Sequence, residues 1–336
     1  MIKGKPQEDS NRLEKWFEFT QKLYCTLDLD QASRIALDIV LQLTGMQRGM
    51  LLTKESENSF RFRHAQNQEG RTLRQDQFPS SDTLLREVCQ QGTPVHKNHD
   101  SVDAKTVLCI PFLSNLAASN TVVGILYCDS PKEIPYGDSD KEMLNVFLMH
   151  AGPALESVIL YDWATRDELT GVYQRHFFDA ISQTEWRRTL RHKHPATVLR
   201  IDLDQLREYN ESYGRIDGDT VLKKTAEILK EICRTEDLIA RYDIDEFAVL
   251  LPETDTAGAR LVSGRITEEV PLLLTRDPEK PVTVSIGGAT YPRCAVNNIA
   301  DLMRLAEIAL SHAKQTGGAR AIHYEPSLTT AHKRIF

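Results

Sequence analysis

The residues best suited to chemistry are carboxylates at the ends of predicted strands. Asp202 and Asp204 close an apolar strand at 197–203, and Asp245 and Glu246 occupy the tip of a predicted hairpin. Hard carboxylate oxygens brought together across a sheet can hold Mg²⁺ against substrate phosphates. By spacing alone the signal is weak, because acidic residues at strand ends and turns are more often simply solvated.

The elements that must position these carboxylates alternate between helix and strand. Helical patterns cover about 175–191, 219–233, a segment after Asp255, and 299–314, and strand patterns cover 197–203, 238–242, 247–251 and 282–289. The order β-α-β-β-α-β with a central hairpin is that of the ferredoxin-like, split-βαβ arrangement. We therefore expect the second half of the chain to place its acidic strand ends side by side.

The first half of the chain predicts helices flanking an antiparallel sheet, an α+β fold. One helix is capped by Asp9 and Ser10 and runs to Leu23, and the next is capped by Asp30 and ends at Gly45. Strand-like segments follow at 49–53, 59–63, 106–113 and 121–128, with a short helix after residues 80–82.

Several short sequence segments in this half resemble those of a GAF domain. They are TLDLD at 26–30, LTG at 43–45, RGMLL at 48–52, IPF at 110–112 and VGILYCD at 123–129. The resemblance covers about residues 10–160. It implies a six-stranded sheet with a ligand-sized cavity on one face, used as a sensor or dimerisation module.

The ligand of such a GAF domain is not readable from the sequence. The Asn-Lys-Phe-Asp-Glu signature of cyclic-nucleotide GAF domains and a chromophore-attachment context for cysteine are both absent. His64, His96 and His150 could ligate haem, but a lone histidine is more often a surface or satisfied core residue. A GAF domain without a ligand is the alternative.

A long helical pattern from Asp138 to about Arg166 connects the two halves. Its apolar residues recur at spacings of four and three, as in a coiled-coil seam: Leu144, Leu148, Ala151, Leu155 and Val158. This seam predicts a homodimer; the same spacing also fits a helix packed on its own GAF sheet, and the two interpretations are not exclusive. Gly152 and Pro153 should kink or interrupt the helix.

The second half resembles a GGDEF domain over about residues 163–325. The ordered motifs are DELTGV at 167–172, DLDQLREYN at 202–210, YGRIDGD at 213–219, RYDIDEF at 241–247, VSIG at 284–287 and AKQTG at 313–317. The resemblance implies diguanylate cyclase ancestry. Two GTP molecules, one per protomer of a dimer, would be condensed to cyclic di-GMP with Mg²⁺.

The same resemblance assigns roles to individual residues. Asp202 and Asp245 match the metal-binding acids, with Glu246 beside them as the third catalytic remnant. Asn210 and Asp219 match the pair that reads guanine. Lys314 matches a phosphate-binding lysine.

Departures from the family pattern predict impaired catalysis. Asp243 and Ile244 replace the two glycines of the signature turn, which would permit φ > 0 and close approach of the nucleotide. A carboxylate about 4 Å from a phosphate costs on the order of 4 kcal/mol at an effective dielectric of about 20. Gly318 stands where active relatives carry a basic residue. A lesser change is Gln174, which replaces the asparagine that precedes the arginine of the family's opening motif.

A second constellation matches the product-binding inhibitory site of the family. Arg234 and Asp237 form an RxxD motif before the signature turn, and Arg265 falls where the family has a second arginine. Alone, an Arg and an Asp three residues apart are usually a local ion pair worth under about 0.5 kcal/mol. Arginine can fork onto guanine O6 and N7, and both arginines can pair phosphate oxygens.

Bulk properties limit the function classes. The 336 residues predict about two domains, and the net charge of −7 argues against sequence-independent binding of nucleic acid or an anionic membrane. Six scattered cysteines without a CxxC pair suit a reducing cytosol. Neither an apolar leader nor an uninterrupted apolar stretch of about 20 residues is apparent, so we expect a cytoplasmic protein.

The sequence thus favours a cytoplasmic, dimeric signalling adaptor that binds cyclic di-GMP and engages an unidentified protein partner. It requires no cofactor, and Mg²⁺ is the ion that the remnant active site would take. One alternative is a weak or conditionally active diguanylate cyclase that makes cyclic di-GMP from two GTP. A third is a protein-interaction module that binds no nucleotide.

Overall fold

The computed structural model describes residues 21–55, 59–78, 82–98, 104–114, 121–275, 277 and 281–328. Its contacts divide the chain into two compact units, Met1–Ala164 and Thr165–Phe336. Both units mix helices with a sheet, so the predicted α+β class is confirmed. The helix predicted to begin at Asp9 and Ser10 lies mostly outside the described residues.

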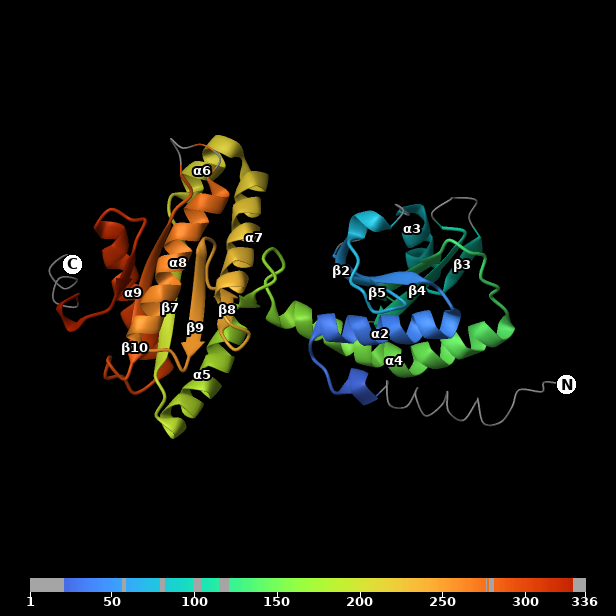
Figure 1. Ribbon diagram of the computed structural model, residues 1–336, viewed down its shortest axis with the longest axis horizontal. Helices are drawn as coiled ribbons and strands as arrows, with labels where there is room; N and C mark the ends of the chain where they lie inside the picture. The colour runs from blue at the N-terminus through green and yellow to red at the C-terminus, as the bar shows by residue number, and fades with distance from the viewer. Residues whose placement is uncertain are drawn as a thin grey trace. The chain divides into compact units, whose positions relative to one another are not determined.

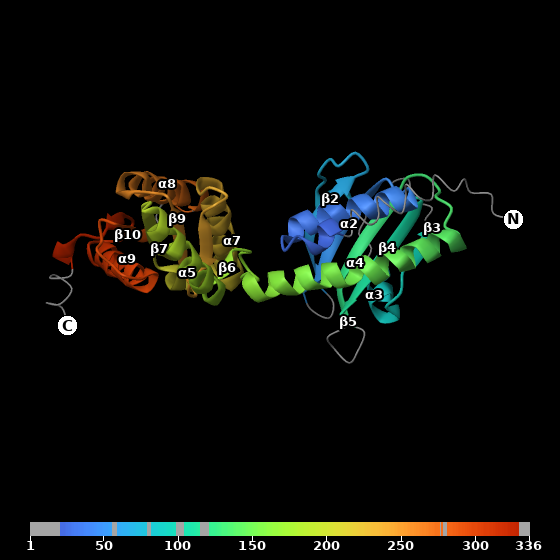
Figure 2. The same ribbon diagram turned by 90° about the horizontal axis from the view of Figure 1, so that it is seen from below.

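The first unit is an antiparallel sheet between helices (Figures 1 and 2). Its described strands follow the order β2-β1-β5-β4-β3. The elements are α2 (Leu29–Thr44), β1 (Arg48–Lys54), β2 (Phe60–Asn67), η1 (Gln75–Gln77), α3 (Asp82–Gln91), β3 (Val95–Asn98), β4 (Thr106–Ser114), β5 (Thr121–Ser130) and α4 (Asp138–Thr165). Helices α2 and α4 share one core with the sheet, and α3 packs in the core on its other face.

Details of this sheet differ from the expectation. The described residues form five strands, where the resemblance implied six, and β3 was not anticipated. Asp28 caps α2 by accepting from Gln31 N, while the predicted cap Asp30 lies in the first turn. Gly45 ends α2 as predicted, in the left-handed conformation with φ 72°.

Helix α4 is continuous from Asp138 to Thr165, so of the two effects expected at Gly152 and Pro153, a kink or an interruption, the interruption is wrong. A proline removes one backbone hydrogen bond from a helix. Burial of the flanking Ala151, Ala154 and Leu155 in the core holds the helix together across that gap. By length and composition alone, Asp140–Thr165 would pass as a membrane span, with half of its most apolar window buried.

The residues of the expected coiled-coil seam pack inside the first unit. Leu144, Ala151, Leu155 and Val158 are buried in the core shared with α2 and the sheet, and Leu148 packs against it. Leu148 is partly exposed and the other four do not face solvent, so the helix packs on its own sheet. Their burial contradicts the premise that this seam would face solvent unless a second copy covered it.

The second unit contains a six-stranded sheet in the order β11-β10-β7-β9-β8-β6. Its elements are β6 (Tyr173–Gln174), α5 (Arg175–His192), β7 (Ala196–Leu203), α6 (Leu206–Tyr213), α7 (Arg215–Ile232), β8 (Leu238–Arg241), β9 (Glu246–Pro252), α8 (Thr256–Leu274), β10 (Val284–Tyr291), α9 (Ile299–Gln315) and β11 (Ala321–His323). Helices α7 and α8 cover one face and α5 and α9 the other (Figure 2). The central antiparallel strands with a β8–β9 hairpin confirm the ferredoxin-like prediction.

The position of α9 depends on Gly287 in the middle of β10. A Cβ atom at Gly287 would lie 2.1 Å from both Ala306 O and Leu310 N. Only a residue without a side chain permits this approach of helix to strand. This close packing places the C-terminal turn of α9, which includes Lys314, beside the end of β7.

Candidate nucleotide site at the ends of β7 and β9

A cavity of about 530 Å³ lies where β7 ends, and acidic, basic and glycine residues line it. Asp202 and Asp204 come from the end of β7, and Asp245 comes from the β8–β9 hairpin. Lys314 and Gly318 come from the end of α9 and the loop after it. The predicted convergence of strand-end carboxylates is therefore confirmed for these residues.

Asp202 is paired with a lysine inside this cavity. Lys314 Nζ lies 2.6 Å from Asp202 Oδ2. Burial raises the pKa of the Asp202 carboxyl to about 6, against the opposing effect of Lys314. Burial alone would lower the pKa of Lys314, but the carboxylate of Asp202 raises it above the usual value. The phosphate-binding candidate and the metal-binding candidate thus neutralise one another.

Glu246 is held by an arginine that the sequence reasoning missed. Arg200 Nε lies 2.5 Å from Glu246 Oε1, and the same guanidinium contacts Glu307 at 3.1 Å. Its carbon Cζ also lies 4.2 Å from the ring centroid of Tyr242. Burial raises the pKa of Glu246, with Arg200 acting in the opposite direction. Glu246 therefore anchors the hairpin and does not line the cavity.

Asp204, the second strand-end acid, is a structural clamp. Its carboxylate accepts hydrogen bonds from Thr283 Oγ1 at 2.7 Å, Ser285 Oγ at 2.6 Å and Ala319 N at 3.0 Å. These bonds join β7 to β10 and to the loop after α9. Three donors leave this carboxylate little capacity for a metal ion.

Asp202 and Asp245 are suited to Mg²⁺ by their chemistry, because both present hard carboxylate oxygens to one cavity. Within the described parts of the chain, no group of three or more His, Cys, Asp or Glu side chains is arranged to hold a metal. An ion here would draw its remaining ligands from phosphate and water. It would also compete with Lys314 for Asp202.

The signature turn does not adopt the positive φ angles that two glycines would permit there. Neither Asp243 nor Ile244 has a positive φ, so the expected strain at isoleucine is absent. Asp243 Oδ1 accepts from Ile244 N at 2.8 Å, and Arg241 donates to Ile244 O at 2.7 Å. The Ile244 side chain is 76% exposed. The carboxylate thus closes the turn in place of a left-handed glycine.

The predicted guanine-reading pair lies on two successive helices. Asn210 is on α6 and Asp219 is on α7. Asn210 Oδ1 is buried and has no hydrogen-bond partner in the described structure. A Cβ at Gly218 would lie 1.7 Å from that oxygen, so Gly218 gives the amide its space. Neither Asn210 nor Asp219 lines the cavity at Asp202.

The RxxD residues form a second polar cluster, between the end of α7 and α8. Asp237 Oδ2 accepts from Arg234 N at 2.7 Å, while Asp237 Oδ1 is buried without a partner in the described structure. Burial raises the pKa of Asp237. It also raises the pKa of Cys233 to about 12, with Asp237 adding to the rise and Arg265 opposing it. Arg265, which pairs with Glu269 at 3.2 Å, is therefore close to the same spot.

Family models match most of the described chain. Residues 28–155 match the model "GAF domain", and residues 164–320 match "Diguanylate cyclase, GGDEF domain". Two curated relatives are the "Probable diguanylate cyclase DgcT" of Escherichia coli, 33% identical over 181 residues, and "Diguanylate cyclase A" of Treponema denticola, 30% identical over 222 residues.

These relatives are matched only in part. The alignment with the Escherichia coli protein covers 53% of this chain and 39% of that protein, and the alignment with the Treponema protein covers 62% and 58%. The solved GGDEF domain of Pseudomonas aeruginosa TpbB is 30% identical, with a TM-score of 0.46, covering 50% of this chain and 99% of that one. By its two family matches, this chain carries a GAF domain followed by a domain of the diguanylate cyclase GGDEF family.

Proposed function

We propose that this protein binds cyclic di-GMP through Arg234, Asp237 and Arg265 and has a degenerate GGDEF domain that makes little or none of it. The observation that carries the proposed impairment is the hydrogen bond from Ile244 N to Asp243 Oδ1. It consumes a backbone donor of the signature turn, beside the Asp245 side chain that lines the cavity. A phosphate approaching this turn meets a carboxylate where a free N–H would be needed.

The charge of Asp243 contributes less than the sequence suggested. Its side chain is exposed, and a pair of charges about 4 Å apart in bulk water interacts by only about 1 kcal/mol. The loss of the donor adds roughly another 0.5–1.5 kcal/mol. Gly318 supplies no cation to offset either loss. Together these effects support impaired GTP turnover without any backbone strain at Ile244.

Binding of cyclic di-GMP is supported by an unused acceptor. Asp237 Oδ1 is buried and lacks a donor in the described structure, and leaving such an atom unpaired costs about 1–3 kcal/mol. A guanine edge that displaces the atoms covering this oxygen would supply the donor through its N–H groups. Arg234 is exposed at the same turn and can reach a base edge or a phosphate. The combination suits a guanine-bearing anion.

We further propose a cytoplasmic homodimer that passes its ligand state to a protein partner. Because the residues of the first expected seam are buried, self-association needs another surface. The outer face of α4 offers Val146 and Met149, which are 40% and 65% exposed. Exposed apolar side chains on a long helix favour pairing with a second copy.

A weak or conditional diguanylate cyclase is the second candidate. Asp202, Asp245 and Lys314 all face one cavity large enough for a nucleotide, which supports retained metal and phosphate contacts. Activity would then require a ligand that separates Lys314 from Asp202. Mg²⁺ would supply charge neutralisation for the phosphates held there.

Two measurements on the purified full chain separate these candidates. Incubation with GTP and Mg²⁺, followed by chromatography of the products, tests synthesis. Calorimetric titration with cyclic di-GMP tests binding. Heat without synthesis supports the proposal, synthesis that vanishes in Asp202→Ala supports the cyclase, and neither signal supports an interaction module.

A further inference from the structure

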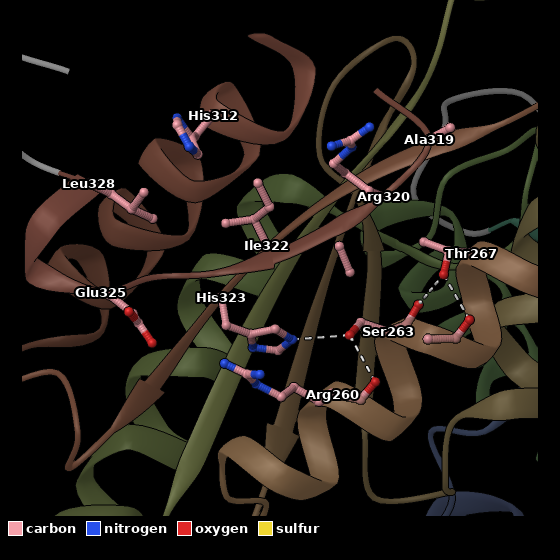
Figure 3. Close-up of a pocket in the computed structure, with 12 residues that line it drawn as sticks. Arg260, Ser263, Thr267, His312, Ala319, Arg320, Ile322, His323, Glu325 and Leu328 are labelled. Carbon is pink, nitrogen blue, oxygen red and sulfur yellow. Dashed lines mark hydrogen bonds between the residues drawn. The ribbon is translucent and has the colours of Figure 1, made fainter. Parts of the chain in front are cut away.

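A groove of about 650 Å³ runs along one free edge of the second sheet, and it adjoins the cavity at Asp202 through Ala319, which lines both. Strand β11 is the edge strand and forms the floor of the groove. Helix α8 contributes Arg260, Ser263 and Thr267 on one side, and α9 contributes His312 on the other. Figure 3 shows β11 passing between the two helices, with His323 directed toward α8.

In the part of the chain that the structure describes, the backbone of β11 has hydrogen-bonding groups without a partner along this groove. Ile286 N donates to Arg320 O at 2.8 Å, and Tyr324 N donates to Gly288 O at 2.7 Å. Backbone groups of successive strand residues point to opposite edges. The N–H and C=O groups of Ala321 and His323 therefore point away from β10, into the groove that these residues line.

The edge strand is fixed in place on the α8 side. Ser263 Oγ donates to Arg260 O at 3.2 Å, so the 3.0 Å contact with His323 Nε2 has the ring nitrogen as donor. Burial lowers the pKa of His323 to about 4, so the ring is neutral near pH 7. A rigid edge needs little ordering when another strand is added to it.

The charges around the groove are predominantly positive. Arg320 donates to the backbone at Gly318 O, and the described structure gives Arg260 no side-chain partner. Among the described residues lining the groove, Glu325 is the one acid, and it is paired with Arg293 at 3.0 Å. The protein as a whole carries a net charge of −7, so this edge is a local exception.

We propose that this groove is a docking site for an extended acidic peptide segment of a partner protein, which adds as a strand to β11. The alternating N–H and C=O groups of Ala321 and His323 match a peptide backbone, which is the basis of strand addition. Arg260 and Arg320 flank the edge and pair with acidic side chains of the segment. A free anion would use the arginines but not the outward carbonyls. The site is independent of cyclic di-GMP binding.

Fluorescence anisotropy with a labelled peptide tests the site on the full chain. The probe is capped Val-Glu-Val-Asp-Val, and the control probe has lysine at both acidic positions. We expect the acidic probe alone to bind, and Arg260→Glu and Arg320→Glu each to weaken it about five- to tenfold. Arg304→Glu, an exposed arginine of α9 paired with Asp301 at 3.9 Å, is the matched control and should change nothing.

A backbone variant separates strand addition from simple charge attraction. Ala321→Pro removes an outward N–H without touching the ladder to β10, and proline is tolerated at edge positions of this kind. We expect it to weaken the probe at least threefold, and we expect the amide signals of Ala321 and His323 to shift on binding. Unchanged affinity in Ala321→Pro, full competition by inorganic pyrophosphate, or no binding of the acidic probe would each overturn the proposal.

Discussion

Lys314 Nζ lies 2.6 Å from Asp202 Oδ2, so the two side chains that the family pattern assigns to phosphate and metal are bound to each other. Asp202 is buried, and an isolated carboxylate in such a place is costly. Lys314 offsets part of that cost by supplying a counter-charge. A metal–nucleotide ligand must therefore replace the lysine at Asp202 and offer the lysine a phosphate in return.

The first prediction concerns the pH dependence of metal binding at Asp202. Its pKa of about 6 means that a proton competes with Mg²⁺ below that pH. We expect Mg²⁺ affinity to fall as pH drops through about 6 and to level off above it. Lys314→Met removes the cation that lowers the Asp202 pKa, so the midpoint should move to higher pH. Titration of Mn²⁺ by electron paramagnetic resonance from pH 5 to 8 measures both curves, and an affinity that does not fall between pH 7 and pH 5 in the unaltered protein would contradict the assignment.

The second prediction concerns synthesis of cyclic di-GMP. Replacing Asp243 and Ile244 by glycine frees the turn donor, but the cation missing at Gly318 remains missing, so little activity should return. Adding Gly318→Arg should raise product formation further, although φ of +69° at this position costs the new side chain about 1–2 kcal/mol.

Product chromatography after incubation with GTP and Mg²⁺ measures this series. Asp202→Ala in the triple variant is the control, because it removes a metal ligand candidate and should abolish whatever activity has returned. Robust synthesis by the unaltered protein would refute the impairment.

The sequence predicted those parts of the fold and site that depend on local pattern. The place of Asp202 follows from an apolar run that stops at carboxylates, that of Asp245 from the predicted hairpin tip, and their convergence from the order of the elements. The stop of α2 at Gly45 also has a local cause, since glycine readily adopts the left-handed conformation that ends a helix.

Other features required the three-dimensional structure. The spacing of Leu144 and Leu155 is the same for a helix packed on a sheet as for a coiled coil, so periodicity could not choose between them. The turn at Ile244 forms without a positive φ because the Asp243 side chain accepts a hydrogen bond from Ile244 N. A comparison of motifs does not reveal that one substituted residue stabilises the turn at the other. Arg200 lies two residues before Asp202 on β7, and this spacing alone places both side chains on one face. That signal is present in the sequence.

The third prediction separates stability from self-association on α4. Leu155 is fully buried, so Leu155→Ala should destabilise the GAF domain by about 2–5 kcal/mol. Met149 is 65% exposed, so Met149→Asp should leave the free energy of unfolding nearly unchanged while weakening dimerisation. Chemical denaturation and sedimentation velocity measure the two effects. Unchanged self-association in Met149→Asp would rule out the outer face of α4.

The fourth prediction tests how α9 is positioned. Gly287→Ala places a Cβ within 2.1 Å of two backbone atoms of α9, which cannot be relieved by a side-chain rotation. We expect a marked loss of stability, of several kcal/mol, as for other overpacked core sites. Gly264→Ala in α8 is the control: its Cβ would meet nothing within 4 Å, and alanine should stabilise the helix by about 0.5–1 kcal/mol. Equal melting temperatures for the two variants would contradict the close packing of α9 on β10.

The last prediction concerns cyclic di-GMP binding at the RxxD cluster. Arg234→Ala should weaken binding by about 1–3 kcal/mol if its guanidinium forks onto a guanine edge. Asp237→Asn is the sharper test. Asp237 Oδ2 already accepts from Arg234 N, and the buried Oδ1 is the acceptor left for a ligand.

An asparagine that keeps the Arg234 N–H bond turns its NH₂ group toward that position, where a guanine N–H would meet a second donor. We therefore expect Asp237→Asn to weaken binding by roughly 1–3 kcal/mol as well, although its shape is unchanged. Arg304→Ala, on α9, is the matched control and should leave the affinity as it was. Calorimetry at pH 7 gives all four constants. If Asp237→Asn binds as tightly as the unaltered protein, Oδ1 is not the acceptor and the cluster is not the binding site.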